Sequence, residues 1–253
     1  MCGIVGYTGF QDAYDIVING LRRLEYRGYD SAGIVLEDKN NSFEVKKTKG
    51  KVSDLVEISE NLKATSHVGM GHTRWATHGV PSDRNSHPHV SNDGKIALVH
   101  NGIIENYDTI KTMLIGKGFT FSSETDTEVL VNLIQYILDT QKINFSEAVR
   151  YALNEVYGAY AITVMHKDYP GVLVVGRLGS PLAIGLGDKE YFIASDASPF
   201  VEFTKEAVYL EDGHMATISL EKGVEIRSIK ENEKIEPAIQ ELKVSLEQIE
   251  KGG

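Results

Sequence analysis

The sequence predicts an α+β fold in which two stacked sheets carry helices on their outer faces. Segments with the composition of strands lie near both ends of the chain, and segments with helical periodicity gather between them. From residue 159 onward, short apolar runs alternate with Gly, Pro and Asp turns, which is typical of antiparallel strands. Stacked sheets covered by helices are one of the few arrangements in which such a mixture can bury a core.

The first elements are a strand and a helix. Residues 3–8 form an apolar run that predicts a buried strand ending at Gly9. Asp12 then opens a pattern whose apolar residues recur at helical spacing as far as Leu24, and residues 26–31 break this pattern. Before residue 67 we further expect strands over 32–36 and 43–48 and a modest helix over 52–62.

The second part of the chain contains most of the predicted elements. A strand over 95–100 is directly followed by Asn101 and Gly102, and Thr125 and Glu128 have the spacing of a capping box at a helix start. The other predictions are a long loop over 81–92, helices over 106–114, 129–138 and 145–156, strands over 159–165, 172–175, 182–184, 191–194, 207–210 and 215–218, and a charged segment over 221–251 that becomes helical near 239–249.

Charge and cysteine content restrict the class of protein. The 253 residues carry a formal net charge of −10, which argues against nucleic acid or an anionic membrane as a partner, because both select basic surfaces. The single cysteine excludes an internal disulfide and favours a reducing cytosol. No apolar run approaches the roughly 18 residues that span a bilayer, and the first residues do not have the pattern of a secretion signal.

Cys2 is the only cysteine and directly follows Met1. Removal of Met1 is expected because residue 2 is small, and it would leave Cys2 with both a thiol and a free α-amine. The amine has an ordinary pKa of about 7.7–8.0 and the thiol one of about 8.5, so the amine can accept the thiol proton near neutral pH. One residue would then supply both nucleophile and base. The alternative is a small hydrophobic residue without chemistry.

Four further residues could act on a substrate. Asn101 and Gly102 could donate a side-chain amide and a backbone N–H to an oxyanion, although Asn-Gly is also the commonest two-residue hairpin turn. Arg74 could clamp a carboxylate or lie at the surface. Asp126 could bind an ammonium group or merely favour a helix start through the helix dipole. Arg74 and Asp126 together would recognise both ends of an α-amino acid.

Six of the eight histidines fall within residues 67–102, which makes a metal site an alternative. His87 and His89 are the tightest pair, but zinc needs three or four ligands and no cysteine lies nearby. We therefore expect histidines that form hydrogen bonds in loops, and no metal. The Gly-rich residues 176–187 lack the glycine motifs that bind phosphate, so neither a phosphate site nor a cofactor is expected.

Six sequence blocks follow one another in order: Cys-Gly-Ile-Val-Gly at 2–6, Arg-Arg-Leu-Glu-Tyr-Arg-Gly-Tyr-Asp-Ser-Ala-Gly at 22–33, Gly-His-Thr-Arg-Trp-Ala-Thr-His-Gly at 71–79, His-Pro-His at 87–89, His-Asn-Gly-Ile-Ile-Glu-Asn at 100–106 and Ser-Glu-Thr-Asp-Thr-Glu at 123–128. Together they resemble the glutaminase domain of the glutamine–fructose-6-phosphate aminotransferase (glucosamine-6-phosphate synthase) family, a class II, N-terminal-nucleophile amidotransferase. The resemblance runs from residue 2 to about residue 250. Residues 26–30, Tyr-Arg-Gly-Tyr-Asp, differ from the His-Arg-Gly-Gln-Asp of phosphoribosyl-pyrophosphate amidotransferases.

The resemblance implies an N-terminal-nucleophile hydrolase fold, a four-layer αββα sandwich with two antiparallel sheets between helix layers. It also implies that Cys2 attacks the side-chain amide of L-glutamine while its own α-amine carries the proton. Asn101 and Gly102 would form the oxyanion hole. Ammonia would leave, and water would hydrolyse the γ-glutamyl thioester to glutamate. No cofactor is implied.

The same resemblance assigns the substrate-binding residues. Arg74 would hold the carboxylate of glutamine and Asp126 its α-amine. Trp75, Thr77 and His78 would line the pocket, with Trp75 near the exit for ammonia. The residues expected to support the site are Arg27 and Gly28, in a loop beside Cys2, and His87.

The resemblance further implies a division of the chain and a missing half. Residues 2–225 would form the type-2 glutamine amidotransferase domain, and residues 226–253 an extension toward an absent sugar isomerase half. In the complete enzyme, expected to be a homodimer, the ammonia would convert fructose 6-phosphate to glucosamine 6-phosphate, the first step of hexosamine synthesis. Two alternatives stay open: an N-terminal-Cys amidotransferase with another ammonia acceptor, and a glutamine-sensing module without turnover.

Overall fold

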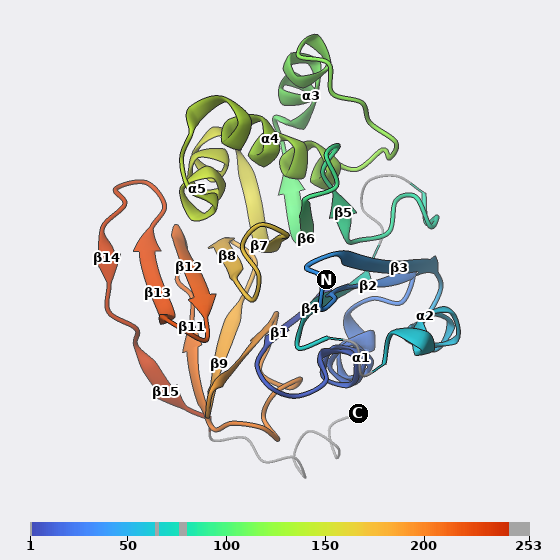
Figure 1. Cartoon of the computed structure of the whole chain (residues 1–253), viewed down its shortest axis with the longest axis vertical. Helices are drawn as coiled ribbons and strands as arrows, with labels where there is room; N and C mark the ends of the chain where they lie inside the picture. Colours follow the sequence, from blue (N-terminus) through green and yellow to red (C-terminus); the bar gives the residue numbers. More distant parts are fainter. Residues whose placement is uncertain (1, 64–65, 76–79, 243–253) are drawn as a thin grey trace.

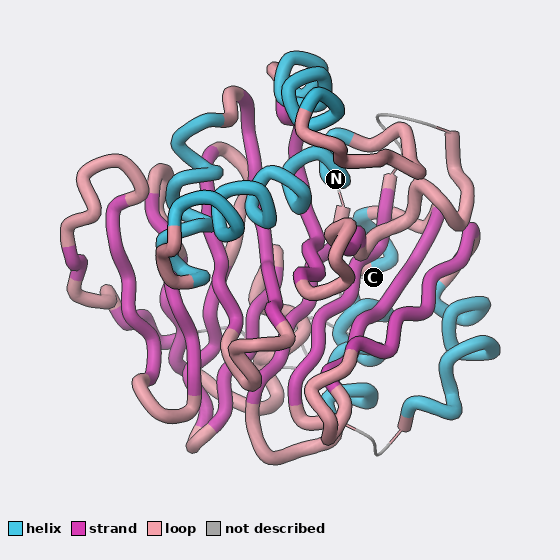
Figure 2. The backbone as a smooth tube through the Cα atoms, turned by 45° about the horizontal axis from the view of Figure 1, so that its top comes forward, coloured by secondary structure: helices cyan, strands magenta, loops and turns pink. Residues whose placement is uncertain are grey.

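The computed structural model describes residues 2–63, 66–75 and 80–242. Within these residues two antiparallel sheets face each other and helices cover their outer sides (Figure 1). Figure 2 shows the strands side by side through the middle of the molecule, with helices beyond them. The predicted order of layers, helix–sheet–sheet–helix, is therefore present.

The first sheet is built around the N-terminal strand. Its eight strands, in spatial order, are β15 (Ile239–Glu241), β11 (Glu206–Tyr209), β9 (Ala183–Gly187), β10 (Glu190–Ala194), β1 (Gly3–Thr8), β4 (Val68–Arg74), β2 (Ser31–Glu37) and β3 (Phe43–Lys49). The seven strands of the second sheet are β14 (Lys234–Ile235), β13 (Gly223–Ser228), β12 (His214–Ser219), β8 (Leu173–Leu178), β7 (Gly158–His166), β6 (Ile96–Ile104) and β5 (His89–Val90).

Helices from separate parts of the sequence cover the two sheets (Figure 1). The first sheet is covered by α1 (Ala13–Arg23) and α2 (Val52–Ser59), with short 3₁₀ turns η1 (Glu25–Arg27) and η2 (Glu60–Leu62) after them. The second sheet is covered by α4 (Asp126–Gln141) and α5 (Phe145–Glu155), and α3 (Tyr107–Gly116) packs beside α4. Among the described residues, no helix has both the length and the apolar character needed to cross a membrane.

Alternating side chains give each strand two environments. Because successive residues of a strand point to opposite faces, Ile4 and Met70 pack between the sheets, whereas Val5 and Tyr7 pack in the cluster that contains the buried face of α1. On β6, Val99 belongs to the core between the sheets. Even-numbered residues of β1 and β4 and odd-numbered residues of β6 therefore meet between the sheets.

Most predicted elements are present, but β4, β5, β13 and β14 lie where no strand was predicted, and β5 falls within the loop expected over 81–92. In β4, glycines and polar residues hide the usual apolar pattern of a strand. The glycine at position 71 is needed for packing, because a Cβ there would lie 2.6 Å from Cγ1 of Val17 on α1. Because α1 lies so close to β4, only glycine fits at position 71. Glycine also weakens the apolar pattern by which a strand is recognised in the sequence.

Two local interpretations were wrong. The strand predicted over 95–100 does not end before Asn101 and Gly102: both lie inside β6, which continues to Ile104, so the alternative of a hairpin turn does not hold. The predicted capping box is only half formed. The side chain of Thr125 accepts from the Glu128 N–H at 3.3 Å, but the Glu128 carboxylate accepts from the N–H groups of residues 122 and 123, at 2.8 and 2.6 Å.

The C-terminal part adds strands to both sheets. The helix predicted near 239–249 is wrong over Ile239–Glu241, where β15 pairs with β11, and the remainder from residue 243 lies outside the described residues. A strand of only three residues, Ile-Gln-Glu, at a sheet edge is too short to show an apolar period. The predicted boundary after residue 225 falls inside β13 and stays a prediction.

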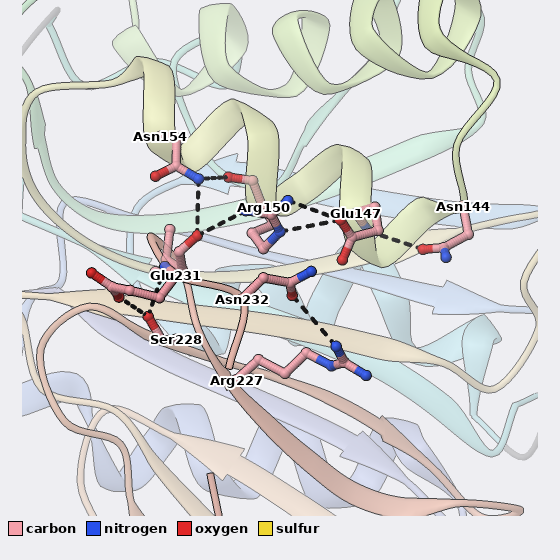
Figure 3. Close-up of polar contacts among 9 residues, drawn as sticks. Asn144, Glu147, Arg150, Asn154, Arg227, Ser228, Glu231 and Asn232 are labelled. Carbon is pink, nitrogen blue, oxygen red and sulfur yellow. Dashed lines mark hydrogen bonds and ion pairs between the residues drawn. The ribbon is translucent and has the colours of Figure 1, made fainter. Parts of the chain in front are cut away.

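Helix α5 is tied to the turn after β13 by side chains that share one backbone acceptor (Figure 3). Arg150 Nη1 and Asn154 Nδ2 both donate to the carbonyl oxygen of Ile229, at 3.1 and 2.9 Å. The carboxylate of Glu147 in turn accepts from Arg150 Nε at 3.2 Å and Nη2 at 3.0 Å. Arg150 is 9% exposed, and its ion pair with Glu147 lies within α5, so the pair orients the guanidinium while the bonds to Ile229 hold the helix against the second sheet.

Replacing Arg150 with Ala is expected to lower the free energy of unfolding by about 1–3 kcal/mol, because the hydrogen bonds of a buried charged group are lost. Arg227 offers a matched control. It is an exposed arginine near the same turn with a single 3.5 Å contact to Asn232, so Arg227→Ala is expected to cost less than about 0.5 kcal/mol. Urea unfolding of both variants measures the difference, and equal losses would contradict this account.

Candidate active site

Cys2 lies at the start of β1, next to the end of β4. The antiparallel register pairs Gly3 with Thr73, which places the residue before Gly3 beside Arg74 and Trp75. The Trp75 N–H donates to Cys2 Sγ at 3.2 Å, and Sγ lies 3.6 Å from the Trp75 carbonyl oxygen. The sheet itself therefore holds the sulfur in place, and the thiol is only partly buried.

Asn101 reaches Cys2 from the other sheet. It occupies an odd-numbered position of β6, so its side chain points between the sheets, where β6 contacts β1 and β4. Its Nδ2 donates to the carbonyl oxygen of Cys2 at 2.9 Å, and its Oδ1 lies 2.8 Å from Nε2 of His72. A side-chain amide therefore stands directly beside the only thiol of the chain.

Gly102 has a backbone conformation that other residues avoid. Its φ is +138°, and a Cβ at this position would lie 1.9 Å from the carbonyl oxygen of Ala159 on the neighbouring strand. Only glycine fits here while β6 keeps its pairing with β7. Glycine at position 102 is therefore required by the strand, and not by a turn.

Arg74 and Asp126 line the same pocket as the thiol. They are 4% and 6% exposed, and they come from the end of β4 and the first residue of α4. Asp126 Oδ2 accepts from the Ile104 N–H at 2.7 Å, which links the start of the helix to the end of β6. The structure thus gathers Cys2, Asn101, Arg74 and Asp126, which are separated in sequence by up to 124 positions, counted from residue 2 to residue 126.

The pocket is narrow in this conformation. Its free volume is about 20 Å³, which is room for about one water molecule. A ligand with the size of an amino acid would therefore have to displace side chains that now line it. These lining residues are Cys2, His72, Arg74, Trp75, His87, His100, Gly102, Thr125, Asp126 and Thr127.

Burial and nearby charge shift the pKa of the Cys2 thiol in opposite directions. Burial raises the pKa of Cys2, and the Trp75 N–H and the Arg74 guanidinium lower it by smaller amounts. Burial also lowers the pKa of Arg74, against the attraction of Cys2 and Asp126. The resting thiol is therefore protonated at neutral pH, and its reaction as a nucleophile requires a base.

The predicted supporting loop lies against the backbone that binds the thiol. Arg27 Nε donates to Asp196 Oδ2 at 2.9 Å, which anchors the turn η1. A Cβ on Gly28 would lie 2.8 Å from the carbonyl carbon of Arg74 and 2.9 Å from the Trp75 nitrogen. Glycine at position 28 therefore allows the loop to lie directly on the peptide whose N–H contacts Cys2 Sγ.

The predicted pocket residues are only partly described. Trp75 is 48% exposed at the mouth of the pocket, with its ring edge-on to Tyr29 at a centroid distance of 5.7 Å. Thr77 and His78 lie outside the described residues. His87 lines the pocket, and its Nδ1 accepts from the His100 N–H at 3.2 Å. Its supporting role stays a prediction.

Two of the buried histidines that line the pocket, His72 and His100, were not singled out from the sequence. His72 and His87 stack with ring centroids 4.2 Å apart, and His100 Nδ1 and His87 Nε2 lie 3.0 and 3.3 Å from Thr127 Oγ1. Burial lowers the pKa of His87 well below its usual value, so this ring is neutral. Among the described residues, no group of three or more His, Cys, Asp and Glu side chains is arranged to hold a metal ion. The signal in the sequence was the position of His72 and His100 within matching blocks.

The geometry agrees with a known sequence family. The profile of the glutamine amidotransferase domain matches residues 57–245, which is more than half of the chain. The chain belongs to the glutamine amidotransferase domain family. In a glutamine amidotransferase domain, a thiol beside an amide donor, with an arginine and an aspartate in the same pocket, is an arrangement suited to the chemistry that the family name describes.

Curated relatives of this glutamine amidotransferase domain are about half identical to it. Glutamine–fructose-6-phosphate aminotransferase (isomerizing) from Bacteroides thetaiotaomicron is 50% identical over 253 residues. The enzyme of the same name from Chlorobaculum tepidum is 51% identical over 257 residues. Each alignment covers 100% of this chain, but the chain spans only 41% of the length of these relatives.

Solved structures support the fold of this glutamine amidotransferase domain. Glutamine phosphoribosylpyrophosphate amidotransferase from B. subtilis, complexed with ADP and GMP, superposes with a TM-score of 0.76 at 29% identity, over 91% of this chain and 50% of that chain. A class-II glutamine aminotransferase domain protein from Silicibacter pomeroyi shares the fold alone, with a TM-score of 0.59 at 15% identity over 90% of this chain and 99% of that chain. The predicted N-terminal-nucleophile αββα fold is confirmed.

Proposed function

We propose that this chain hydrolyses L-glutamine to glutamate and ammonia through a thioester on Cys2. The observation that carries the proposal is the convergence of the Cys2 thiol with Arg74 and Asp126 in one pocket, beside the Asn101 amide. An arginine and an aspartate are complementary to the carboxylate and the ammonium of an α-amino acid. A thiol with an adjacent amide donor suits attack on an acyl carbon.

In the proposed reaction, the Cys2 thiol gives its proton to the α-amine of the same residue, and Sγ bonds to the amide carbon of glutamine. The developing oxyanion accepts hydrogen bonds from Asn101 Nδ2 and the Gly102 N–H. The carbon–nitrogen bond then breaks, and ammonia leaves with the proton that the amine returns. Water adds to the thioester, the carbon–sulfur bond breaks, and glutamate and the thiol are restored.

Trp75 at the pocket mouth, with Thr77 and His78, would complete the glutamine pocket, and Trp75 would lie near the exit for ammonia. Arg27 and Gly28 would support the peptide that contacts Sγ, and His87 would support the wall of the pocket. We propose no cofactor and no metal. These roles rest on the matching sequence blocks and on the positions of Trp75, Gly28 and His87 around Cys2.

We further propose that the chain is the glutaminase part of a longer enzyme that converts fructose 6-phosphate to glucosamine 6-phosphate. The names of relatives 50% and 51% identical to it, and the 41% of their length that it spans, support this proposal. Residues 2–225 would be the amidotransferase domain and 226–253 the connection to a sugar isomerase half. The complete enzyme would be a cytosolic homodimer, and this chain alone would release ammonia without making an amino sugar.

The free α-amine of Cys2 provides the sharpest test. A preparation that begins at Cys2 is expected to hydrolyse glutamine, and one with a single additional Gly before Cys2 is expected to be slower by about 10²-fold or more, since the general base is lost. Intact mass verifies both N-termini, and release of glutamate measures turnover. Equal turnover would contradict the proposed base. Glutamine binding without turnover in either preparation would instead favour the sensing module.

A further inference from the structure

His72 is the buried polar residue that contacts the Asn101 amide. It lies on β4, is 1% exposed, and faces the space between the sheets, like the neighbouring even-numbered Met70. Its Nε2 lies 2.8 Å from Asn101 Oδ1. The amide therefore has Cys2 on one side and a histidine on the other.

The two contacts of Asn101 fix which way its amide faces. The carbonyl oxygen of Cys2 can only accept a hydrogen bond, so the NH₂ group of Asn101 must face it, at 2.9 Å. Asn101 Oδ1 then faces His72 and can only accept, so Nε2 of His72 must carry the proton. His72 Nδ1 has no hydrogen-bond partner among the described residues, which fits a nitrogen without a proton.

From this geometry we propose that His72 is a positioning residue: its Nε2–H holds the Asn101 amide with the NH₂ group turned toward the acyl-transfer site at Cys2. The proposal deepens the proposed glutaminase function and rests on it. The opposite tautomer would set a lone pair against Asn101 Oδ1 and favour a flipped amide. A flipped amide would present an oxygen, and not a donor, to the developing oxyanion.

The surroundings of His72 keep this ring neutral and immobile. Burial lowers the pKa of His72 to about 3, so the ring does not become charged in the physiological range. The His87 ring stacks on it with an interplanar angle of 18°. His87 in turn packs against β2, because a Cβ on Gly33 would lie 2.0 Å from the His87 carbonyl oxygen. Gly33 is the register partner of His72, so the strand pair and the histidine stack form one unit.

Two polar substitutions of His72 distinguish a role in positioning Asn101 from a role in packing. In His72→Gln the side-chain NH₂ can occupy the place of Nε2 and donate to Asn101, whereas in His72→Asn the shorter amide cannot reach it. We expect His72→Asn to lower kcat for glutamine by about 10-fold to 100-fold with KM changed less than about threefold, and His72→Gln to retain most of kcat. Equal loss of kcat in both variants, in parallel with loss of thermal stability, would show a merely structural role.

A double-mutant cycle tests whether His72 acts through Asn101. Asn101→Ala alone is expected to lower kcat by about 10²-fold to 10³-fold. Adding His72→Asn to it should cost little more, because the group that His72 positions is already absent. If the two losses multiply, His72 acts independently of Asn101 and the proposal is wrong.

The tautomer can be measured without turnover. In ¹⁵N-histidine-labelled wild-type protein, the ring nitrogens of His72, assigned by comparison with His72→Gln, are expected to show a protonated Nε2 and a bare Nδ1. The Nδ1–H tautomer or a charged ring would overturn the proposal. A wild-type chain that fails to hydrolyse glutamine would refute the proposed function, and this spectrum would still decide the state of His72.

Discussion

Replacing Cys2 with Ala is expected to reduce glutamine hydrolysis by at least about 10³-fold, because the chain holds no other thiol that could form the thioester. The fold should survive. The side chain is small and only partly buried, and the position of β1 is set by its pairing with β4 and β10. Glutamate release measures the loss, and urea unfolding verifies that stability changes little.

Ser195→Ala is a control for Cys2→Ala, because it loosens the strand that carries Cys2 but leaves the thiol in place. Ser195 Oγ accepts from the Ile4 N–H at 2.9 Å, two residues beyond Cys2. Its removal is expected to cost about 1–3 kcal/mol of stability by leaving a buried donor unpaired, and to leave most of the turnover intact. If Cys2→Ala retained turnover, the nucleophile would have to lie elsewhere, and the mechanism would be wrong.

The pH dependence follows from the protonation of the thiol. Burial raises the pKa of Cys2, so the thiolate is scarce at neutral pH and grows as pH rises toward the raised pKa. Alkylation of Cys2 by iodoacetamide should therefore become faster with rising pH through and above the usual thiol range of about 8.5. Because the raised pKa leaves little thiolate at neutral pH, a base next to the sulfur is part of the proposed mechanism.

Local patterns predicted the elements whose apolar residues form a clear period or a continuous run. The periodicity that opens at Asp12 gave α1, and the buried apolar run over 3–8 gave β1. Both depend only on the order of residues within one segment. In contrast, β4 lacks an apolar period because Gly71 must admit a helix residue at close range. Its packing is set by a partner that is distant in the sequence.

The active site also combines features that local sequence predicts with features that depend on contacts between distant segments. Cys2, Arg74 and Asp126 were candidates from their residue types alone, but their meeting depends on strand register and on the contact between two sheets, which a local pattern does not contain. The Asn-Gly pair at 101–102 has the composition of a turn, and only its pairing with β7 reveals a strand. His72 was not a candidate from its residue type, because its importance lies in a hydrogen bond across the sheets.

Asp126→Asn is expected to lower kcat/KM for L-glutamine by about 10-fold to 100-fold, because a hydrogen bond to a charged group contributes about 1.5–3 kcal/mol. The loss should lie mainly in KM if the carboxylate binds the ammonium equally in the ground state and the transition state. The fold should persist, since the Asn oxygen can still accept from the Ile104 N–H that Asp126 Oδ2 binds at 2.7 Å.

Two comparisons make this prediction specific to the ammonium group. Asp126→Ala removes the acceptor as well as the charge, so it should also destabilise the chain by about 1–3 kcal/mol, by leaving the Ile104 N–H unpaired. Glutaramate is glutamine without its α-amine, so the wild-type chain should hydrolyse it poorly and Asp126→Asn should lose little further activity on it. If Asp126→Asn lowered kcat/KM equally for both substrates, the carboxylate would act on something other than the ammonium. The salt bridge proposed between Asp126 and glutamine would then have to be abandoned, while the tie between α4 and β6 would still explain the burial of Asp126.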